Sequence, residues 1–187
     1  MDALSALHNR VSMPRLIAPA PTLEQQEALF QAALRTPDHA RLRPWRFLVV
    51  EGAALEQLGE LFHTAARADA ADPDAESVRR ARQLPLRAPM IIVAISSPRQ
   101  HPKVPEQEQD MSCAVAVGNM LVAAHAMGLG AVWRTGEPAR NPVIRDGLGL
   151  SAGEKIIAFL YLGQSLTPDR PVPVLDSADY FRRWPVN

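Results

Sequence analysis

The chain has 187 residues, and 47% of them are hydrophobic, which is enough for one domain with a substantial core. The 20 basic and 20 acidic side chains cancel, so no overall charge attracts nucleic acid or an anionic membrane. The single cysteine, Cys113, excludes an internal disulfide and a thiolate-cluster metal site, and residues 1–13 lack the apolar run of a secretion signal. We therefore expect one cytoplasmic domain over residues 1–187.

The N-terminal quarter predicts two helices joined by an extended arm. Asp2 is placed to cap a short first helix. The next segment, RVSMPRLIAPAP at 10–21, is expected to run extended, because its three prolines lack a backbone donor. A second helix is expected over 22–35, where Thr22 and Gln25 have the spacing of a capping box and the hydrophobic residues recur with helical period.

The middle of the chain alternates strands and helices. WRFLVVE at 45–51 predicts a buried strand, and 53–68 returns to helical spacing. A short Arg-rich helix is expected over 76–83, before a second apolar strand, MIIVAIS, at 90–96. The loop at 97–109 contains three prolines and is a candidate cleft wall.

The segment DMSCAVAVGNMLVAAHAMGLG, at 110–130, is apolar almost all round. Polar Asn119 and His125 interrupt it, and small residues lie on every side, so it predicts a central helix with close neighbours all round rather than a membrane span. Two further strands are expected at 131–135 and 156–163, with a short helix between them.

This mixture of helices and strands, without repeats or linkers, predicts an α+β domain around a central sheet. We do not expect the arm and the proline-bearing tail after Gln164 to fold on their own. A homodimer in which they embrace the partner would bury them.

The sequence carries no motif for catalysis by its own side chains: no zinc motif, Walker loop, GxGxxG or GxSxG. His101 lies in a polar loop, and Cys113 lies in the apolar helix, where a buried inert thiol is expected.

The noteworthy groups are cations. Arg10 and Ser12 follow the first helix and could bind a phosphate, although an arginine also complements the dipole of a helix C-terminus. Arg35 at the end of the second helix leaves the same two alternatives.

Several segments resemble the flavin-dependent nitroreductase family in both sequence and order. They are NRVS at 9–12, TPDHARLRPWRF at 36–47, the small-residue central helix, GLGAVWRTG at 128–136 and FLYLG at 159–163. The resemblance covers nearly the whole chain, from Asp2 to Gly163, and is greatest to the compact bacterial branch of YdjA-like NAD(P)H nitroreductases. It implies an α+β nitroreductase-like fold, with a central, mostly antiparallel sheet flanked by helices. It also implies an intertwined homodimer with FMN at the subunit interface.

The resemblance also implies which residues contact the ligands. The FMN positions are Arg10, Val11, Ser12, Arg35 and His39 and, from the other subunit, Trp133, Arg134 and Thr135. The nicotinamide nucleotide is associated with the end of the central helix, at Ala123, Ala124, His125, Ala126, Met127 and Gly128. Asp38, Arg41 and Arg43 stand where many relatives have serine, asparagine and glutamine, and the sequence leaves open whether the two arginines face flavin or solvent.

The function implied is that of an FMN oxidoreductase that takes a hydride from NADH or NADPH at flavin N5. The electrons then pass to a nitro, quinone or other planar electrophilic acceptor. No catalytic side chain and no metal are expected, because the cofactor carries the chemistry. Two alternatives stay open: a relative that dehydrogenates or dehalogenates a specific metabolite, and a non-catalytic flavin-binding protein.

Overall fold

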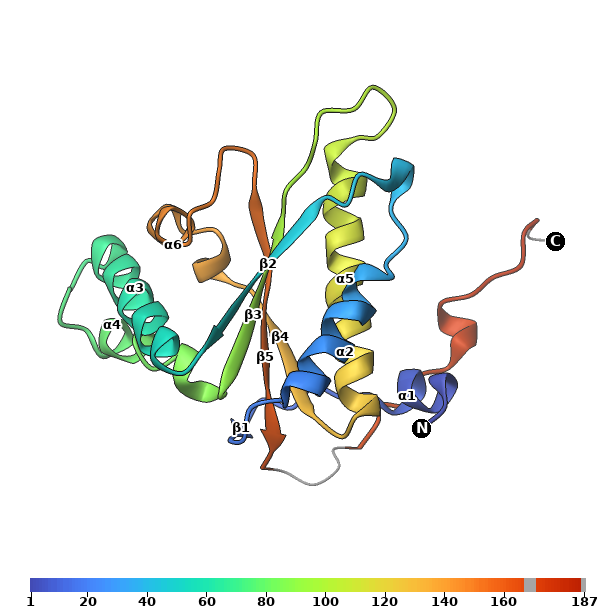
Figure 1. Cartoon of the computed structure of the whole chain (residues 1–187), viewed down its shortest axis with the longest axis horizontal. Helices are drawn as coiled ribbons and strands as arrows, with labels where there is room; N and C mark the ends of the chain where they lie inside the picture. The colour runs from blue at the N-terminus through green and yellow to red at the C-terminus, as the bar shows by residue number, and fades with distance from the viewer. Residues whose placement is uncertain (167–170, 186–187) are drawn as a thin grey trace.

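The computed structural model describes residues 1–166 and 171–185 (Figure 1). Five strands form one sheet: β1 (Leu16–Ile17), β2 (Trp45–Glu51), β3 (Met90–Ser96), β4 (Gly130–Arg134) and β5 (Lys155–Ser165). β5 is the longest and pairs with β3, with β4 and, near its C-terminal end, with β1. β2 pairs with β3, and all these pairings are antiparallel. The predicted α+β fold with an antiparallel central sheet is confirmed.

Helices cover both faces of this sheet (Figure 1). The helices are α1 (Ala3–Asn9), α2 (Leu23–Leu34), α3 (Ala53–Asp69), α4 (Glu76–Ala81), α5 (Glu106–Ala126) and α6 (Pro142–Gly147). Four short 3-10 turns lie at His39–Arg41, Pro85–Arg87, Glu137–Ala139 and Ser177–Asp179. Helices α3, α4 and α6 lie on one face, and α2 and α5 lie on the other (Figure 1).

Two hydrophobic clusters, one on each face, explain why β3 is apolar without interruption. Its odd-numbered residues 91–95 pack in the cluster that contains Phe62 of α3 and Phe159 of β5. The rings of Phe62 and Phe159 meet edge to face, with centroids 5.3 Å apart. The even-numbered residues 90–94 pack in the other cluster, with Leu29 and the small residues of α5. A strand buried on both faces has no polar side to expose.

Two predictions about burial were wrong. The strand at 45–51 forms as expected, but β2 is the edge strand of the sheet and only Val50 in it is buried. The central helix begins at Glu106 and buries one face only, so that Met111 and Val115 are 55% and 46% exposed. Both errors have one cause, because a single chain supplies no further layer beyond β2 or beyond the outer face of α5.

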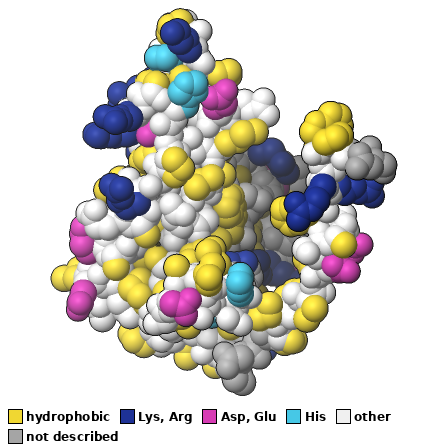
Figure 2. Space-filling model, turned by 90° about the vertical axis from the view of Figure 1, so that its right-hand side faces the viewer, with side chains coloured by type: hydrophobic (Ala, Val, Ile, Leu, Met, Phe, Trp, Pro, Cys, Tyr) yellow, Lys and Arg dark blue, Asp and Glu magenta, His cyan; other side chains and the backbone are white. Residues whose placement is uncertain are grey.

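The N-terminal arm packs on its own chain more closely than the sequence indicated. Met13 and Leu16 are buried, and the Met13 N–H donates to the carbonyl of Ala131 in β4 at 2.9 Å. The tail does not pack in this way. Tyr180, Phe181 and Trp184 are exposed, Trp184 at 90%. Figure 2 shows the tail standing apart from the body of the molecule, with Lys or Arg side chains visible in the hollow between them.

Among residues 1–166 and 171–185, no helix is both long and apolar enough to cross a membrane.

Candidate functional site

The first group of predicted site residues lies where α1 ends. Arg10 is the C-cap residue of α1, and its backbone N–H donates to Ala6 at 3.1 Å. Its side chain turns inward, and its Nη1 atom is buried without a hydrogen-bond partner in the described part of the chain. Residues 10–12 line a cavity of about 420 Å³ together with Pro171 and Pro173 of the tail.

The second group lies at the end of β4, and the arm that follows the first group packs along this strand. The bond from Met13 to Ala131 places the arm along β4, and Arg134 Nη2 lies 3.5 Å from the carbonyl of Pro14. The Arg134 guanidinium lies over the ring of Tyr161, 5.5 Å from its centroid, while its Nε is buried and unpartnered within the described residues. The structure therefore packs the arm that follows residues 10–12 against β4, while residues 10–12 and 133–135 line separate cavities.

A cavity of about 390 Å³ opens beside this second group, and sequence reasoning missed one of its residues. The cavity is lined by residues 133–136 and by Arg87, Tyr161 and other side chains of the α3 face. Burial raises the pKa of Tyr161 to about 12, although Arg134 and Arg87 oppose this effect. Arg87 lies in the 3-10 turn before β3, far from the other site residues in sequence. No local pattern could assign it a role, because only sheet pairing brings it here.

The third group follows α2 and forms a separate cavity. A cavity of about 650 Å³ is lined by residues 34–38 and by Arg41, Arg43 and Trp45, and we call it the arginine cavity. Asn119 of α5 fixes its wall, because its Nδ2 donates to Thr36 Oγ1 at 3.0 Å and to the carbonyl of Ala32 at 3.3 Å. Sequence reasoning took Asn119 only as an interruption of an apolar helix.

His39 does not line the arginine cavity. Its Nδ1 lies 2.9 Å from Glu108 Oε2 in the first turn of α5, and both side chains are about half exposed. This contact ties the loop after α2 to the N-terminal end of α5. Arg35, by contrast, lines the cavity directly.

The last predicted group, residues 123–128, forms the C-terminal end of α5. Gly128 has a φ of 74°, and the amides that follow the helix donate to the carbonyls of Ala123, Ala124 and His125. These three carbonyls therefore already accept hydrogen bonds, and the negative end of the helix dipole lies at this end of α5. The His125 ring is different, since its Nε2 is buried and has no partner among the described residues.

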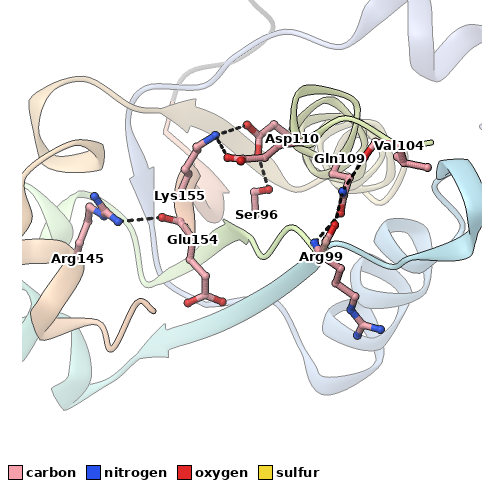
Figure 3. Close-up of polar contacts among 9 residues, drawn as sticks. Ser96, Arg99, Val104, Gln109, Asp110, Arg145, Glu154 and Lys155 are labelled. Atoms are coloured by element: carbon pink, nitrogen blue, oxygen red, sulfur yellow. Dashed lines mark hydrogen bonds and ion pairs between the residues drawn. The ribbon is translucent and has the colours of Figure 1, made fainter. Parts of the chain in front are cut away.

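A polar cluster holds the loop after β3 against the start of α5 (Figure 3). Lys155 Nζ binds Asp110 at 2.8 Å and also Glu106, and Asp110 accepts a hydrogen bond from Ser96. Gln109 exchanges hydrogen bonds with the backbone of Arg99, at 2.9 and 2.8 Å. The loop at 97–109, which the sequence suggested as a cleft wall, is therefore held by hydrogen bonds both at Arg99 and at the start of α5.

The predicted groups line separate cavities in the described part of the chain. The arginine cavity meets the middle of α5, where Asn119 binds Thr36. Residues 10–12 lie near the C-terminal end of α5, beside which α1 packs (Figure 1). Asn119 and Ala126 are seven positions apart in α5, or about 10 Å at about 1.5 Å per residue.

Residues 15–164 match the profile of the nitroreductase family, described as "Nitroreductase family". The chain belongs to this family. It is 42% identical to the Escherichia coli K12 protein named "Putative NAD(P)H nitroreductase YdjA" over 163 residues, which cover 87% of this chain and 88% of that protein. It is 35% identical to the Haemophilus influenzae protein named "Putative NAD(P)H nitroreductase" over 96% of this chain and 98% of that protein.

Solved structures share the fold of this nitroreductase family member. A nitroreductase-like family protein from Bacillus cereus superposes with a TM-score of 0.82 at 21% identity, over 98% of this chain and 96% of that one. A nitroreductase with bound FMN from Bacteroides fragilis gives 0.75 at 21% identity, over 98% of both chains. The FMN-dependent nitroreductase NfnB from Mycobacterium smegmatis, in complex with NADPH, gives 0.74 at 16% identity, over 97% of both chains.

Proposed function

We propose that this protein is an FMN-dependent oxidoreductase that transfers a hydride from NADH or NADPH to a nitro, quinone or similar planar electrophilic acceptor. The observation that carries the proposal is the pair of buried nitrogens, Arg10 Nη1 and Arg134 Nε, that lack a partner among the described residues. A charged donor that is buried unpaired is costly, so an anionic ligand group is the expected partner. The phosphate of FMN fits, because a guanidinium binds phosphate oxygens through two parallel donors.

Each group of residues has a distinct role in this proposal. When bound, FMN supplies the N5 atom that accepts the hydride and passes the electrons on. Residues 10–12 bind its phosphate and ribityl chain, and residues 133–135 of the other subunit hold it from the end of β4. Arg35 and His39 contact the cofactor from the loop after α2, and Arg35 places a fixed positive charge that favours electron uptake. No side chain is assigned a proton transfer.

We also propose that residues 123–128 adjoin the nicotinamide nucleotide. The side chain of His125 is the group in this segment that can bind a ligand, because its Nε2 is unpartnered among the described residues while the backbone carbonyls are occupied.

The proposed site is completed by a second copy of the chain, since residues 10–12, Arg35 and residues 133–135 line three separate cavities of one chain. Apolar groups that one chain leaves exposed support this arrangement. Met111 and Val115 form a stripe on α5, and Tyr180, Phe181 and Trp184 extend along the tail. A homodimer would bury both sets of side chains.

The direct test is to purify the protein and look for a yellow flavin spectrum. FMN released on denaturation, and bleaching when NADH or NADPH is added anaerobically, are the expected results. A colourless protein that takes up no added FMN would contradict the proposal. Bound FMN that neither nucleotide reduces would favour a non-catalytic flavin-binding protein.

A mixed-dimer experiment tests the origin of the two arginines. Arg10→Ala and Arg35→Ala homodimers should each bind FMN about tenfold or more weakly, by fluorescence titration. If the site takes Arg10 from one chain and Arg35 from the other, mixed dimers of the two variants contain one intact site and regain tight binding at half the sites. If both arginines come from the same chain, no site in the mixed dimer is intact and no recovery is seen. Arg67→Ala on α3 is the matched control.

A further inference from the structure

The arginine cavity carries an excess of positive charge that the proposed cofactor contacts do not explain. Three guanidinium groups, from Arg35, Arg41 and Arg43, and one carboxylate, from Asp38, line it. Asp38 is partly engaged already, because its Oδ1 accepts the backbone N–H of Arg43 at 3.1 Å. The nearby Glu108 is paired with His39. The cavity therefore presents a net positive surface without a protein counter-ion for each cation.

None of the three guanidinium groups has a hydrogen bond or ion pair with another side chain or carbonyl in the ranges 1–166 and 171–185. Among the described residues, three arginines form ion pairs: Arg46 with Glu154, Arg80 with Glu76 and Arg82 with Glu60. The five donors of each cavity arginine are free for a ligand.

The backbone that carries Arg41 and Arg43 is strained. Ala40, Arg41 and Arg43 have φ values of 63°, 55° and 50°, and they are the only non-glycine residues with positive φ in the described parts of the chain. Each such residue costs about 1 kcal/mol or more. A loop keeps this cost only when its surroundings enforce it, and strain of this kind concentrates at ligand sites.

Several contacts enforce the shape of this loop. Asp38 Oδ1 accepts the Arg43 amide, and the Asp38 carbonyl accepts the Arg41 amide at 3.3 Å. The Ser97 amide donates to the carbonyl of Pro44 at 3.0 Å, which ties the loop to the end of β3. These contacts fix the backbone so that both arginines, which are exposed, line one open cavity.

We propose that Arg41 and Arg43 form an anion subsite, so that the substrate bound at the flavin must carry a carboxylate or phosphate group for efficient turnover. The inference rests on the proposed oxidoreductase function and adds the class of substrate. Two planar guanidinium groups side by side can bind the oxygens of a carboxylate or phosphate through pairs of parallel hydrogen bonds. Two sources share this chemistry: a carboxylate on the acceptor, and the additional 2′-phosphate of NADPH.

The test compares matched pairs of substrates that differ only in the anionic group. 4-Nitrobenzoate is compared with 4-nitrobenzamide as acceptor, and NADPH with NADH as donor, by the ratio of kcat/KM values within each pair. In the Arg41→Gln/Arg43→Gln double variant the charged-to-neutral ratio should fall by about tenfold to hundredfold for at least one pair. The pair that changes identifies the source of the anion.

Arg67→Gln is the matched control, because it removes the same charge from α3 on the opposite face of the sheet and should leave both ratios unchanged. Arg43→Gly provides a second variant, since glycine accepts the left-handed backbone at this position and keeps the loop intact. It should reduce the same ratio as the double variant does.

Equal ratios in the parent protein and both cavity variants would overturn the inference. Loss of FMN from the double variant, with equal effects on charged and neutral substrates, would also overturn it, because the arginines would then hold the cofactor. Calorimetric binding of the same compound pairs requires no electron transfer. If the protein neither binds nor reduces FMN, the proposed function fails, while a binding preference for the charged compounds that the double variant abolishes would still support the subsite.

Discussion

Glu154 is a buried carboxylate that joins the turn before β5 to Arg46 of β2. The Arg46 guanidinium binds it through two hydrogen bonds of 2.8 and 2.7 Å, and Arg46 also donates to the carbonyl of Gly149. The Ser151 amide and the Ser97 side chain add hydrogen bonds. Led by the bond from Arg46, these contacts lower the pKa of Glu154 from 4.5 to about 2, against the opposing effect of burial.

The difference between the two pKa values fixes the expected size of the effect. At about 1.4 kcal/mol for each pH unit between them, the ionised carboxylate adds about 3 kcal/mol to the free energy of unfolding at neutral pH. We therefore expect Glu154→Gln to lose about 3 kcal/mol, or about 6–12 °C in Tm for a chain of this length. Because the folded-state pKa is the lower one, this contribution is complete above pH 4.5 and is lost as the pH falls through about 2.

Urea unfolding of the parent protein and Glu154→Gln, measured from pH 7 down to the acid limit of folding, checks both the size and the pH dependence. The matched control is Glu60→Gln, whose carboxylate binds Arg82 in an exposed pair, and which should cost less than about 1 kcal/mol. A Glu154→Gln effect as small as that of Glu60→Gln, or one that does not shrink toward acid pH, would refute the reasoning.

Two further predictions follow from single buried groups. Asn119→Ala removes both hydrogen bonds to the end of α2 and leaves the buried Thr36 hydroxyl without this partner. It should lower the free energy of unfolding by about 1–3 kcal/mol in urea titrations, and an unchanged midpoint would contradict this role. Burial raises the pKa of the Cys113 thiol to about 12, with a smaller effect of Asp110, so iodoacetamide at pH 8 should label it only after unfolding. Rapid labelling of the native protein, detected by mass spectrometry, would show that the Cys113 thiol is accessible and would contradict this prediction.

Local structure was well predicted from the sequence. Thr22 and Gln25 form the expected capping box, and the uninterrupted apolar run at 90–96 is the strand buried on both faces. These features are encoded within a few residues, because capping geometry and hydrophobic period depend on near neighbours along the chain. The boundaries were less accurate, since α5 begins four residues before the apolar pattern does.

The sequence also placed Arg10 and Arg35 at the ends of the first two helices. For neither residue could it decide between ligand binding and a favourable interaction with the helix dipole. Arg10 has a buried nitrogen without a partner within the described residues, whereas Arg35 lines an open cavity. Whether β2 is central or at an edge, and whether α5 is covered all round, depends on pairings between segments far apart in the chain. Period and composition carry no information about such pairings.

By itself, then, the sequence determined most of the helices and strands and the resemblance to flavin-dependent nitroreductases, which in turn implied the antiparallel sheet, because these depend on local patterns and their order. Only the tertiary structure decided that the arm packs along β4, that Thr36 next to Arg35 meets Asn119 of α5, and that Arg41 and Arg43 line one cavity. The physical reason is that charge and burial are properties of the assembled surface. A cation is free or paired according to neighbours that the fold, and not the chain order, brings to it.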